Sequence, residues 1–193
     1  MSKTSFYDAD ELAALGLKSY GRNVRISRYC RLYCPGNISL GDNVRIDDFC
    51  ILSAGKSITI GSYVHIGCHT TILGSAEVTI RDFCSISGRV SIYSSSDDYS
   101  GRWMTNPMVP EELTNVTDAP VTFGKHVIVG CGSVILPGVT LGEGVAVGAM
   151  SLVARSLAGG GIYAGNPARH VIPRAERYRE LERRIDGRMP DGK

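Results

Sequence analysis

The sequence predicts an all-β solenoid wound in triangular coils, and three features of its 193 residues indicate this fold. A nine-residue motif with apolar residues at its first, third, seventh and ninth positions recurs along the chain, and a repeat at a fixed period indicates a repeat architecture. An aliphatic residue also recurs every six positions, often followed by Gly, and the residue four places after it is small or β-branched. The copies of the motif span residues 38–46, 58–66, 78–86, 121–129 and 139–147, with a weaker copy at 18–26.

A period of six excludes a helix, because it places successive apolar residues on different helical faces. Short strands that meet at turns can use this period, since three six-residue sides make one triangular coil. Stacked coils pair their strands in parallel and bury one column of aliphatic side chains. We expect the column to contain Leu40, Ile46, Leu52, Ile60, Ile66, Ile72, Ile80, Ile86, Ile92, Val129, Ile135, Leu141, Val147 and Val153.

The chain begins with a predicted helix over residues 7–15, where Asp8 and Glu11 have the spacing of a capping box and Gly16 follows as a C-cap. Coils are expected from residue 18 to residue 92.

The repeat then stops over Tyr93–Pro120, and a loop of this length within a compact repeat is typically functional or disordered. Trp103, Met104, Met108 and Tyr99 indicate that this loop packs against another surface.

Coils resume from residue 121 to about 162. A charged helix is expected over 173–185, with Tyr178, Leu181 and Ile185 on one side. We therefore divide the chain into an N-terminal helical segment (1–17), one solenoid domain (18–172) and a C-terminal helix with a tail (173–193).

The composition argues against several functions. A net charge of +2 without a basic and aromatic stripe argues against nucleic-acid binding. The acidic N-terminus and the absence of a long apolar run predict a cytoplasmic protein without membrane insertion. Cys30, Cys50 and Cys84 occupy the small inward position of the repeat, so we interpret them as buried thiols. The four histidines lack metal-ligand spacing, and no metal is expected.

Three segments in order, 121–139, 147–155 and Tyr163-Ala-Gly-Asn-Pro-Ala-Arg169, carry a resemblance to a known family. They resemble the hexapeptide-repeat acyltransferases, in particular the branch of galactoside and maltose O-acetyltransferases and bacterial sugar acetyltransferases. The resemblance implies a left-handed parallel β-helix, although parallel crossovers are normally right-handed. It also implies acetyl-CoA as cosubstrate and a homotrimer with active sites between subunits.

The resemblance further implies where coenzyme A binds. In that family the pantetheine arm lies along the last coils, where small residues leave it room, and basic residues meet the phosphates. Transferred by position, the residues near the pantetheine arm are Cys131, Gly148, Ala149 and Ala154. Those expected to reach phosphate are Arg155, Arg169 and Arg174.

The catalytic base departs from the family pattern. The galactoside branch places a histidine at the head of the long loop, but the matching residue here is Asp97, and residues 93–120 contain no histidine. One hypothesis makes His65 the base with Asp97 orienting it. The other needs no strong protein base: a neutral amine acceptor attacks unaided and loses its proton late, to Asp97 or to the thiolate. His69, Asp98 and Tyr99 are the expected acceptor contacts.

We therefore expect acetyl-CoA-dependent transfer of an acetyl group to a hydroxyl or amino group of a sugar. The acceptor would be a small nucleotide-linked sugar or a sugar of a bacterial surface polysaccharide. Alternatives are an antibiotic acetyltransferase of the same fold and a non-catalytic scaffold. A carbonic-anhydrase-like member would need three zinc-binding histidines at set coil spacings, which His65, His69 and His126 do not supply.

Overall fold

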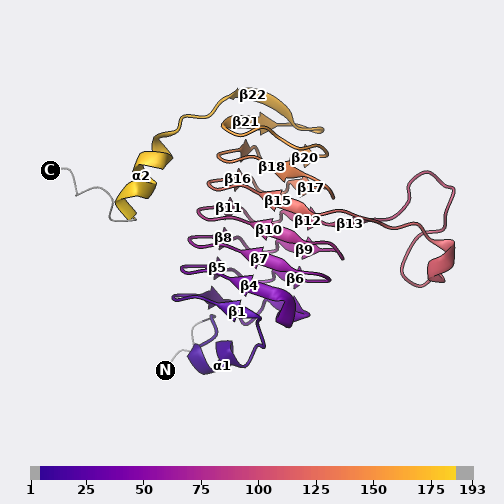
Figure 1. Ribbon diagram of the computed structural model, residues 1–193, viewed down its shortest axis with the longest axis horizontal. Helices are drawn as coiled ribbons and strands as arrows, with labels where there is room; N and C mark the ends of the chain where they lie inside the picture. The colour runs from indigo at the N-terminus through magenta and orange to yellow at the C-terminus, as the bar shows by residue number, and fades with distance from the viewer. Residues whose placement is uncertain (1–4, 186–193) are drawn as a thin grey trace.

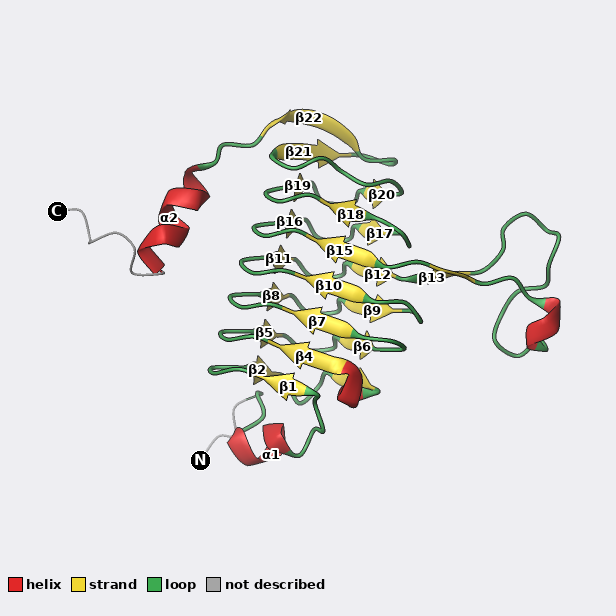
Figure 2. Ribbon diagram, viewed as in Figure 1, coloured by secondary structure: helices red, strands yellow, loops and turns green. Residues whose placement is uncertain are grey.

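The computed structural model describes residues 5–185, and most of them form a parallel β-helix with three faces (Figures 1 and 2). Face 1 consists of β1 (Ser19–Tyr20), β4 (Ile38–Leu40), β7 (Ile58–Ile60), β10 (Val78–Ile80), β15 (Val121–Phe123) and β18 (Thr140–Leu141). Face 2 consists of β2 (Arg25–Ile26), β5 (Arg45–Ile46), β8 (His65–Ile66), β11 (Ser85–Ile86), β16 (Ile128–Val129), β19 (Ala146–Val147), β21 (Gly161–Ala164) and β22 (Arg169–Pro173). Face 3 consists of β3 (Arg31–Tyr33), β6 (Ile51–Ser53), β9 (Thr71–Leu73), β12 (Ser91–Tyr93), β17 (Val134–Ile135) and β20 (Leu152–Val153).

The strand register confirms the twenty-residue period. Ile46 pairs with Ile66, and Ile66 pairs with Ile86, so equivalent residues stack directly on one another. The predicted aliphatic column is buried, and Ile66 and Ile86 are fully inaccessible. Burying an aliphatic side chain of this size contributes about 1.5–3 kcal/mol, so the column accounts for much of the stability of the prism.

The predicted inward cysteines are also buried. Burial raises the pKa of the Cys30 and Cys84 thiols to about 12 and that of Cys50 to about 11. Cys34, Cys68 and Cys131 are exposed, and none of the six cysteines forms a disulfide.

Each coil turns at three edges of the prism, which we name by the faces that they join. At the 1–2 edge, Tyr63, Phe83 and His126 have φ near +60°, and at the 2–3 edge Phe49 and His69 do. A positive φ is uncommon for a residue with a side chain. These positions place large side chains above one another on the outside of the prism.

The N-terminal helix α1 (Ala9–Ala13) has the predicted capping box between Asp8 and Glu11, although it is shorter than the predicted helix. Its Leu12 is buried against the first coil, so α1 covers the N-terminal end of the core. A 3₁₀ turn, η1 (Pro35–Asn37), joins the first two coils.

The insertion forms an arm that projects from the 3–1 edge (Figure 1). Its base is an antiparallel ribbon of β13 (Ser95–Ser96) and β14 (Thr117–Asp118), and its tip contains the 3₁₀ helix η2 (Glu111–Leu113). Tyr99 is 93% exposed and Met108 90% exposed. The apolar side chains from which packing was predicted are therefore largely exposed within this chain.

After the last coil, β22 pairs antiparallel with β21 and leads to α2 (Arg177–Ile185). Helix α2 begins later than predicted because β22 occupies the chain up to Pro173. Of the predicted apolar side, Tyr178 packs against His126, with ring centroids 4.6 Å apart. Leu181 and Ile185, which were predicted on the same side of the helix, are exposed.

Candidate active site

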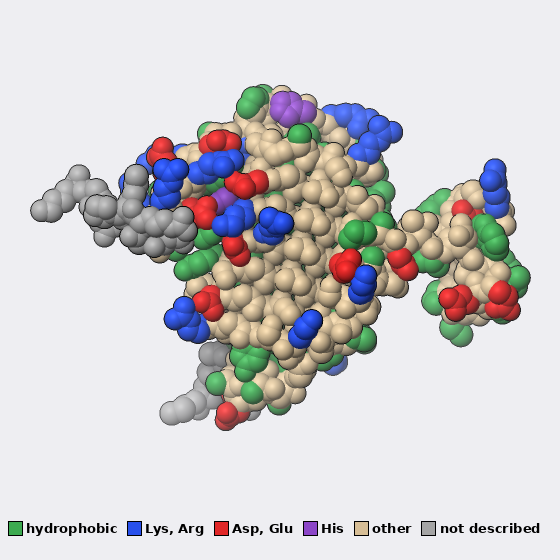
Figure 3. Space-filling view, in the orientation of Figure 1, with side chains coloured by type: hydrophobic (Ala, Val, Ile, Leu, Met, Phe, Trp, Pro, Cys, Tyr) green, Lys and Arg blue, Asp and Glu red, His purple; other side chains and the backbone are tan. Residues whose placement is uncertain are grey.

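A hollow of about 180 Å³ at the C-terminal end of the prism brings three predicted donor residues together. Ala154 follows β20, Arg155 lies beside it, and Arg169 begins β22. Both guanidinium groups are exposed and form no ion pair within residues 5–185. Figure 3 shows basic side chains gathered near this corner, at the upper right. The hollow is lined by Val153, Ala154, Arg155, Leu157, Pro167, Ala168 and Arg169.

The other predicted donor residues, Cys131, Gly148 and Ala149, lie along the 2–3 edge on adjacent coils. The coils are linked here by a hydrogen bond in which the amide of Met150 donates to the Cys131 carbonyl at 2.8 Å. A Cβ on Gly148 would lie 3.1 Å from the Ala164 Cβ, so this position is packed closely against the next coil. The residues at these three positions are small, as the predicted path of the pantetheine arm requires.

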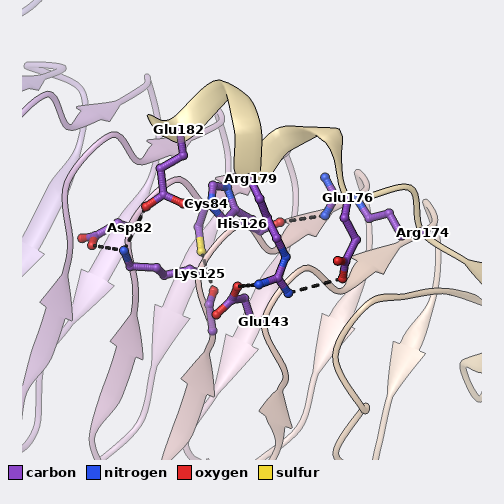
Figure 4. Close-up of polar contacts among 10 residues, drawn as sticks. Asp82, Cys84, Lys125, His126, Glu143, Arg174, Glu176, Arg179 and Glu182 are labelled. Atoms are coloured by element: carbon purple, nitrogen blue, oxygen red, sulfur yellow. Dashed lines mark hydrogen bonds and ion pairs between the residues drawn. The ribbon is translucent and has the colours of Figure 1, made fainter. Parts of the chain in front are cut away.

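Arg174 lies apart from these residues. Its Nη1 donates to the carbonyl oxygens of His126 at 2.7 Å and Gly144 at 3.2 Å. Its guanidinium also lies 4.9 Å from the centre of the Tyr178 ring. Figure 4 shows Arg174 pointing into the contact between α2 and the 1–2 edge. The structure therefore does not bring Arg174 together with Arg155 and Arg169.

A second hollow, of about 440 Å³, lies where the arm leaves the prism. It brings together Asp97 and Tyr99, two of the predicted acceptor-site residues. Asp98 turns away and accepts a 2.8 Å hydrogen bond from the Ser100 hydroxyl, which lowers the pKa of the Asp98 carboxyl. The hollow is lined by Tyr93, Ser95, Ser96, Asp97, Tyr99, Val134, Leu136 and Pro137.

His65 has a different partner from the expected one. Its Nε2 lies 2.8 Å from Asp47 Oδ2, while Arg45 Nε donates to Asp47 Oδ1 at 2.6 Å. Burial raises the pKa of Asp47, but the hydrogen bonds from His65 and Arg45 outweigh it and leave that pKa below its usual value. His65 lies on face 2 and Asp97 at the 3–1 edge, so one chain does not bring them together. Arg45 and His65 are register partners on adjacent coils, and Asp47 follows Arg45 by two residues. Superposing the repeats of the sequence would therefore have placed Asp47 near His65.

His69 lies at the 2–3 edge, where its ring stacks on Phe49 with centroids 5.0 Å apart. His126 is nearly buried at the 1–2 edge and contacts Glu182. No group of three or more His, Cys, Asp or Glu side chains within residues 5–185 could hold a metal ion. Within the same residues, neither α-helix has the length and apolar character needed to cross a membrane.

Comparison with known proteins identifies the family. Residues 120–155 match the family model described as bacterial transferase hexapeptide (six repeats). The chain is 48% identical over 179 residues to the dTDP-4-amino-4,6-dideoxy-D-glucose acyltransferase of Escherichia coli, covering 92% of this chain and 93% of that protein. The chain belongs to the hexapeptide-repeat acyltransferases.

Solved structures of this family agree. AntD, an N-acyltransferase from Bacillus cereus in complex with dTDP and 3-hydroxybutyryl-CoA, has a TM-score of 0.93 and 45% identity, covering 97% of this chain and 99% of that one. A maltose O-acetyltransferase from Clostridium difficile has a TM-score of 0.59 at 22% identity, covering 86% and 74%, and shares the fold. The expected left-handed parallel β-helix is confirmed.

The family membership confirms that the chain is an acyl-CoA-dependent sugar acyltransferase. The expectation that the cosubstrate is a coenzyme A thioester is therefore confirmed for acyl-CoA in general. The alternative of a non-catalytic scaffold no longer stands. The roles of the individual site residues stay predictions.

Proposed function

We propose that this hexapeptide-repeat acyltransferase acylates the 4-amino group of a dTDP-linked 4-amino-4,6-dideoxy hexose. The observation that carries this proposal is the 48% identity, along 92% of the chain, to an enzyme with that acceptor. AntD, which matches along nearly all of this chain, was crystallised with the same nucleotide sugar and coenzyme A.

The chemistry of the arm supports an amine acceptor. Residues 93–120 contain no histidine, and Asp97 stands at the head of the arm. A sugar hydroxyl needs a base during attack, whereas a neutral amine does not. The amine nitrogen bonds to the thioester carbonyl, the carbon–sulfur bond breaks, and one amine proton is lost. Asp97 accepts a hydrogen bond from the amine, and the proton ends on the departing thiolate to give coenzyme A.

A serine supports the same assignment. AntD was crystallised as variants of one serine and of an aspartate ten residues further along its chain, in complexes with dTDP or the nucleotide sugar. In this sequence Ser87 and Asp97 are the one serine–aspartate pair with that spacing. We therefore assign Ser87, which the sequence analysis missed, to the acceptor site with Asp97.

Ser87 and Asp97 lie at different edges of the prism. Ser87 follows β11 at the 2–3 edge, and Tyr93, near Asp97, ends β12 at the 3–1 edge. After the turn at residues 88 and 89, the chain runs along face 3 from Val90 to Tyr93, roughly 10 Å at about 3.3 Å per residue. One amino group cannot contact both in one chain. The protein is therefore proposed to be a homotrimer in which Asp97 of one subunit meets Ser87 of the next.

The exposed arm supports this assembly, because Tyr99 and Met108 would be covered by a neighbouring subunit. We place the enzyme in the cytoplasm and in the biosynthesis of a surface polysaccharide. Six free cysteines are typical of a reducing compartment, and acyl-CoA is available there.

The experiment that tests the function incubates the protein with dTDP-4-amino-4,6-dideoxyglucose and either acetyl-CoA or 3-hydroxybutyryl-CoA, and measures thiol release and product mass. We expect one acyl group on the 4-amino group. The matched control is the 4-hydroxy sugar nucleotide, which should release no thiol. Turnover of the hydroxy sugar without turnover of the amino sugar would overturn the proposal in favour of O-transfer with His65 as base.

A further inference from the structure

Two columns of stacked rings run along the outside of the prism, and the chain covers one of them. At the 1–2 edge, Tyr63, Phe83 and His126 stack with centroids 4.9 and 5.0 Å apart, and Tyr178 of α2 packs on the last ring. That column has an aromatic partner within its own chain.

The second column, which we name the aromatic ladder, consists of Tyr29, Phe49 and His69 at the 2–3 edge. Its centroids are 5.6 and 5.0 Å apart. Tyr29 and Phe49 are 59% and 52% exposed. No other aromatic ring within residues 5–185 stacks on the aromatic ladder. The ladder is therefore a stacking surface without a partner in this chain.

A hollow of about 360 Å³ adjoins the aromatic ladder and is lined in part by Tyr29 and Phe49. Arg31, on β3 of face 3, also lines it and forms no ion pair within the described part of the chain. Arg89 continues the column above His69 and is exposed. Rings with nearby unpaired guanidinium groups favour a ligand that combines a planar ring with negative charge.

The aromatic ladder lies on the same edge as Ser87. Strands on adjacent coils lie about 4.8 Å apart, so Phe49, two coils below Ser87, is roughly 10 Å from it, and Tyr29 is roughly 15 Å from it. This is the reach of an extended nucleotide sugar from its hexose to its base. Above Ser87, the same edge carries the small residues expected for the pantetheine arm. Acceptor and donor would thus approach Ser87 from opposite ends of one edge.

We propose that the aromatic ladder is the nucleoside subsite of the acceptor. The pyrimidine ring stacks on Phe49 and Tyr29, and the diphosphate meets Arg89. This inference rests on the proposed function, because it takes a nucleotide sugar as the acceptor.

The test measures the binding of dTDP to the full chain by calorimetry, with Phe49→Ala as the variant. Base–aromatic stacking of about 1–3 kcal/mol predicts that the Kd of dTDP rises about five- to one-hundred-fold. The Kd of coenzyme A should stay unchanged. The matched control is Tyr33→Ala, which removes an aromatic side chain of similar exposure (56%) that is not in the ladder, and it should leave both constants unchanged.

The outcomes are distinguishable. If the natural sequence does not bind dTDP, the proposed function fails. If it binds dTDP and Phe49→Ala binds equally well, the aromatic ladder is not the subsite, while the proposed function stands. If Phe49→Ala changes the mass measured by light scattering, the ladder is an interface between copies of the chain, and the inference is overturned. Phe49→Leu, which keeps apolar bulk without the ring, replaces Phe49→Ala if that variant does not fold.

Discussion

His126 Nε2 lies 2.7 Å from Glu182 Oε2, and this contact joins the C-terminal helix to the 1–2 edge of the prism. Lys125 Nζ lies 3.1 Å from the other oxygen of the same carboxylate, and Arg179 of α2 pairs with Glu143 at 3.0 Å (Figure 4). Helix α2 has no buried residue of its own, so these polar contacts and the Tyr178 ring hold it in place.

The first prediction is that acid releases α2. The hydrogen bond from His126, with that from Lys125, lowers the pKa of Glu182 below its ordinary 4.5. A carboxyl whose folded pKa is depressed stabilises the docked helix above its unfolded pKa, and this contribution is lost as the pH falls through the folded pKa. Hydrogen exchange of residues 177–185, corrected for intrinsic rates, should therefore accelerate below about pH 4.5.

Glu182→Gln should exchange faster than the natural sequence at pH 7 and lose most of this acid dependence. The control is Glu180→Gln, since the Glu180 side chain is exposed and forms no ion pair within residues 5–185. Equal exchange in both variants at neutral pH would show that Glu182 does not hold the helix.

The second prediction separates the arginines that the sequence grouped together. Arg169→Ala and Arg155→Ala should each raise the KM for acyl-CoA, roughly ten-fold for one exposed phosphate contact, with little change in kcat. The phosphates do not change during transfer, so their binding affects ground state and transition state alike. Arg174→Ala should leave that KM unchanged and accelerate hydrogen exchange in α2. A raised KM in Arg174→Ala alone would place the nucleotide at the 1–2 edge instead.

The third prediction decides between the two mechanisms. With an amine acceptor, Asp97→Asn should lower kcat roughly ten- to one-hundred-fold, because the hydrogen bond from the amine to the carboxylate is weakened, whereas His65→Ala should cost less than about ten-fold. The remaining rate should increase with pH as more of the amine becomes neutral. A loss of a hundred-fold or more in His65→Ala would instead make the His65–Asp47 pair the base of an O-transfer reaction. Asp47→Asn would then reduce kcat as well.

The fourth prediction concerns the six thiols. Cys34, Cys68 and Cys131 are exposed and should react with a disulfide reagent in the native protein. Cys30, Cys50 and Cys84 are buried, and their raised pKa values keep them protonated, so they should react only after unfolding. The thiolate that the reagent releases before and after denaturant is added gives the number of exposed thiols and the number of buried thiols. Coenzyme A should slow the reaction of Cys131 in particular, and an unaffected Cys131 would place the pantetheine arm elsewhere.

The six-residue period predicted the prism and its core because the fold is locally periodic. Each aliphatic residue, such as Ile66, meets its register partner one repeat away, so local spacing determines a long-range contact. The capping box of Asp8 and Glu11 is local in the same way. The sequence also placed Ala154, Arg155 and Arg169 near one another, since they follow directly on the last coils.

Contacts that join distant segments were not predictable in this way. Glu182 meets His126 across 56 residues, and nothing in the charged helix marks which carboxylate reaches the prism. Helix α2 therefore appeared as an amphipathic helix, and the polar docking was missed. The aromatic ladder did carry a signal in the sequence, because Tyr29, Phe49 and His69 are spaced by twenty residues. Each of them alone resembles an isolated exposed aromatic residue at a turn, and the column becomes visible only when the repeats are superposed. Ser87 lacked a signal of its own.

The antiparallel pairing of β22 on β21 limits how this molecule can associate. A stack of parallel strands ends in a row of free backbone groups, onto which another copy could add its own coil and continue the column. Strand β22 reverses the chain direction and occupies that row on face 2, while the Ala168 amide donates to the Leu152 carbonyl at the end of face 3. At the other end, α1 covers the first coil. Another copy therefore cannot continue the parallel stack of coils on face 2, while the long sides of the prism stay available for lateral contacts.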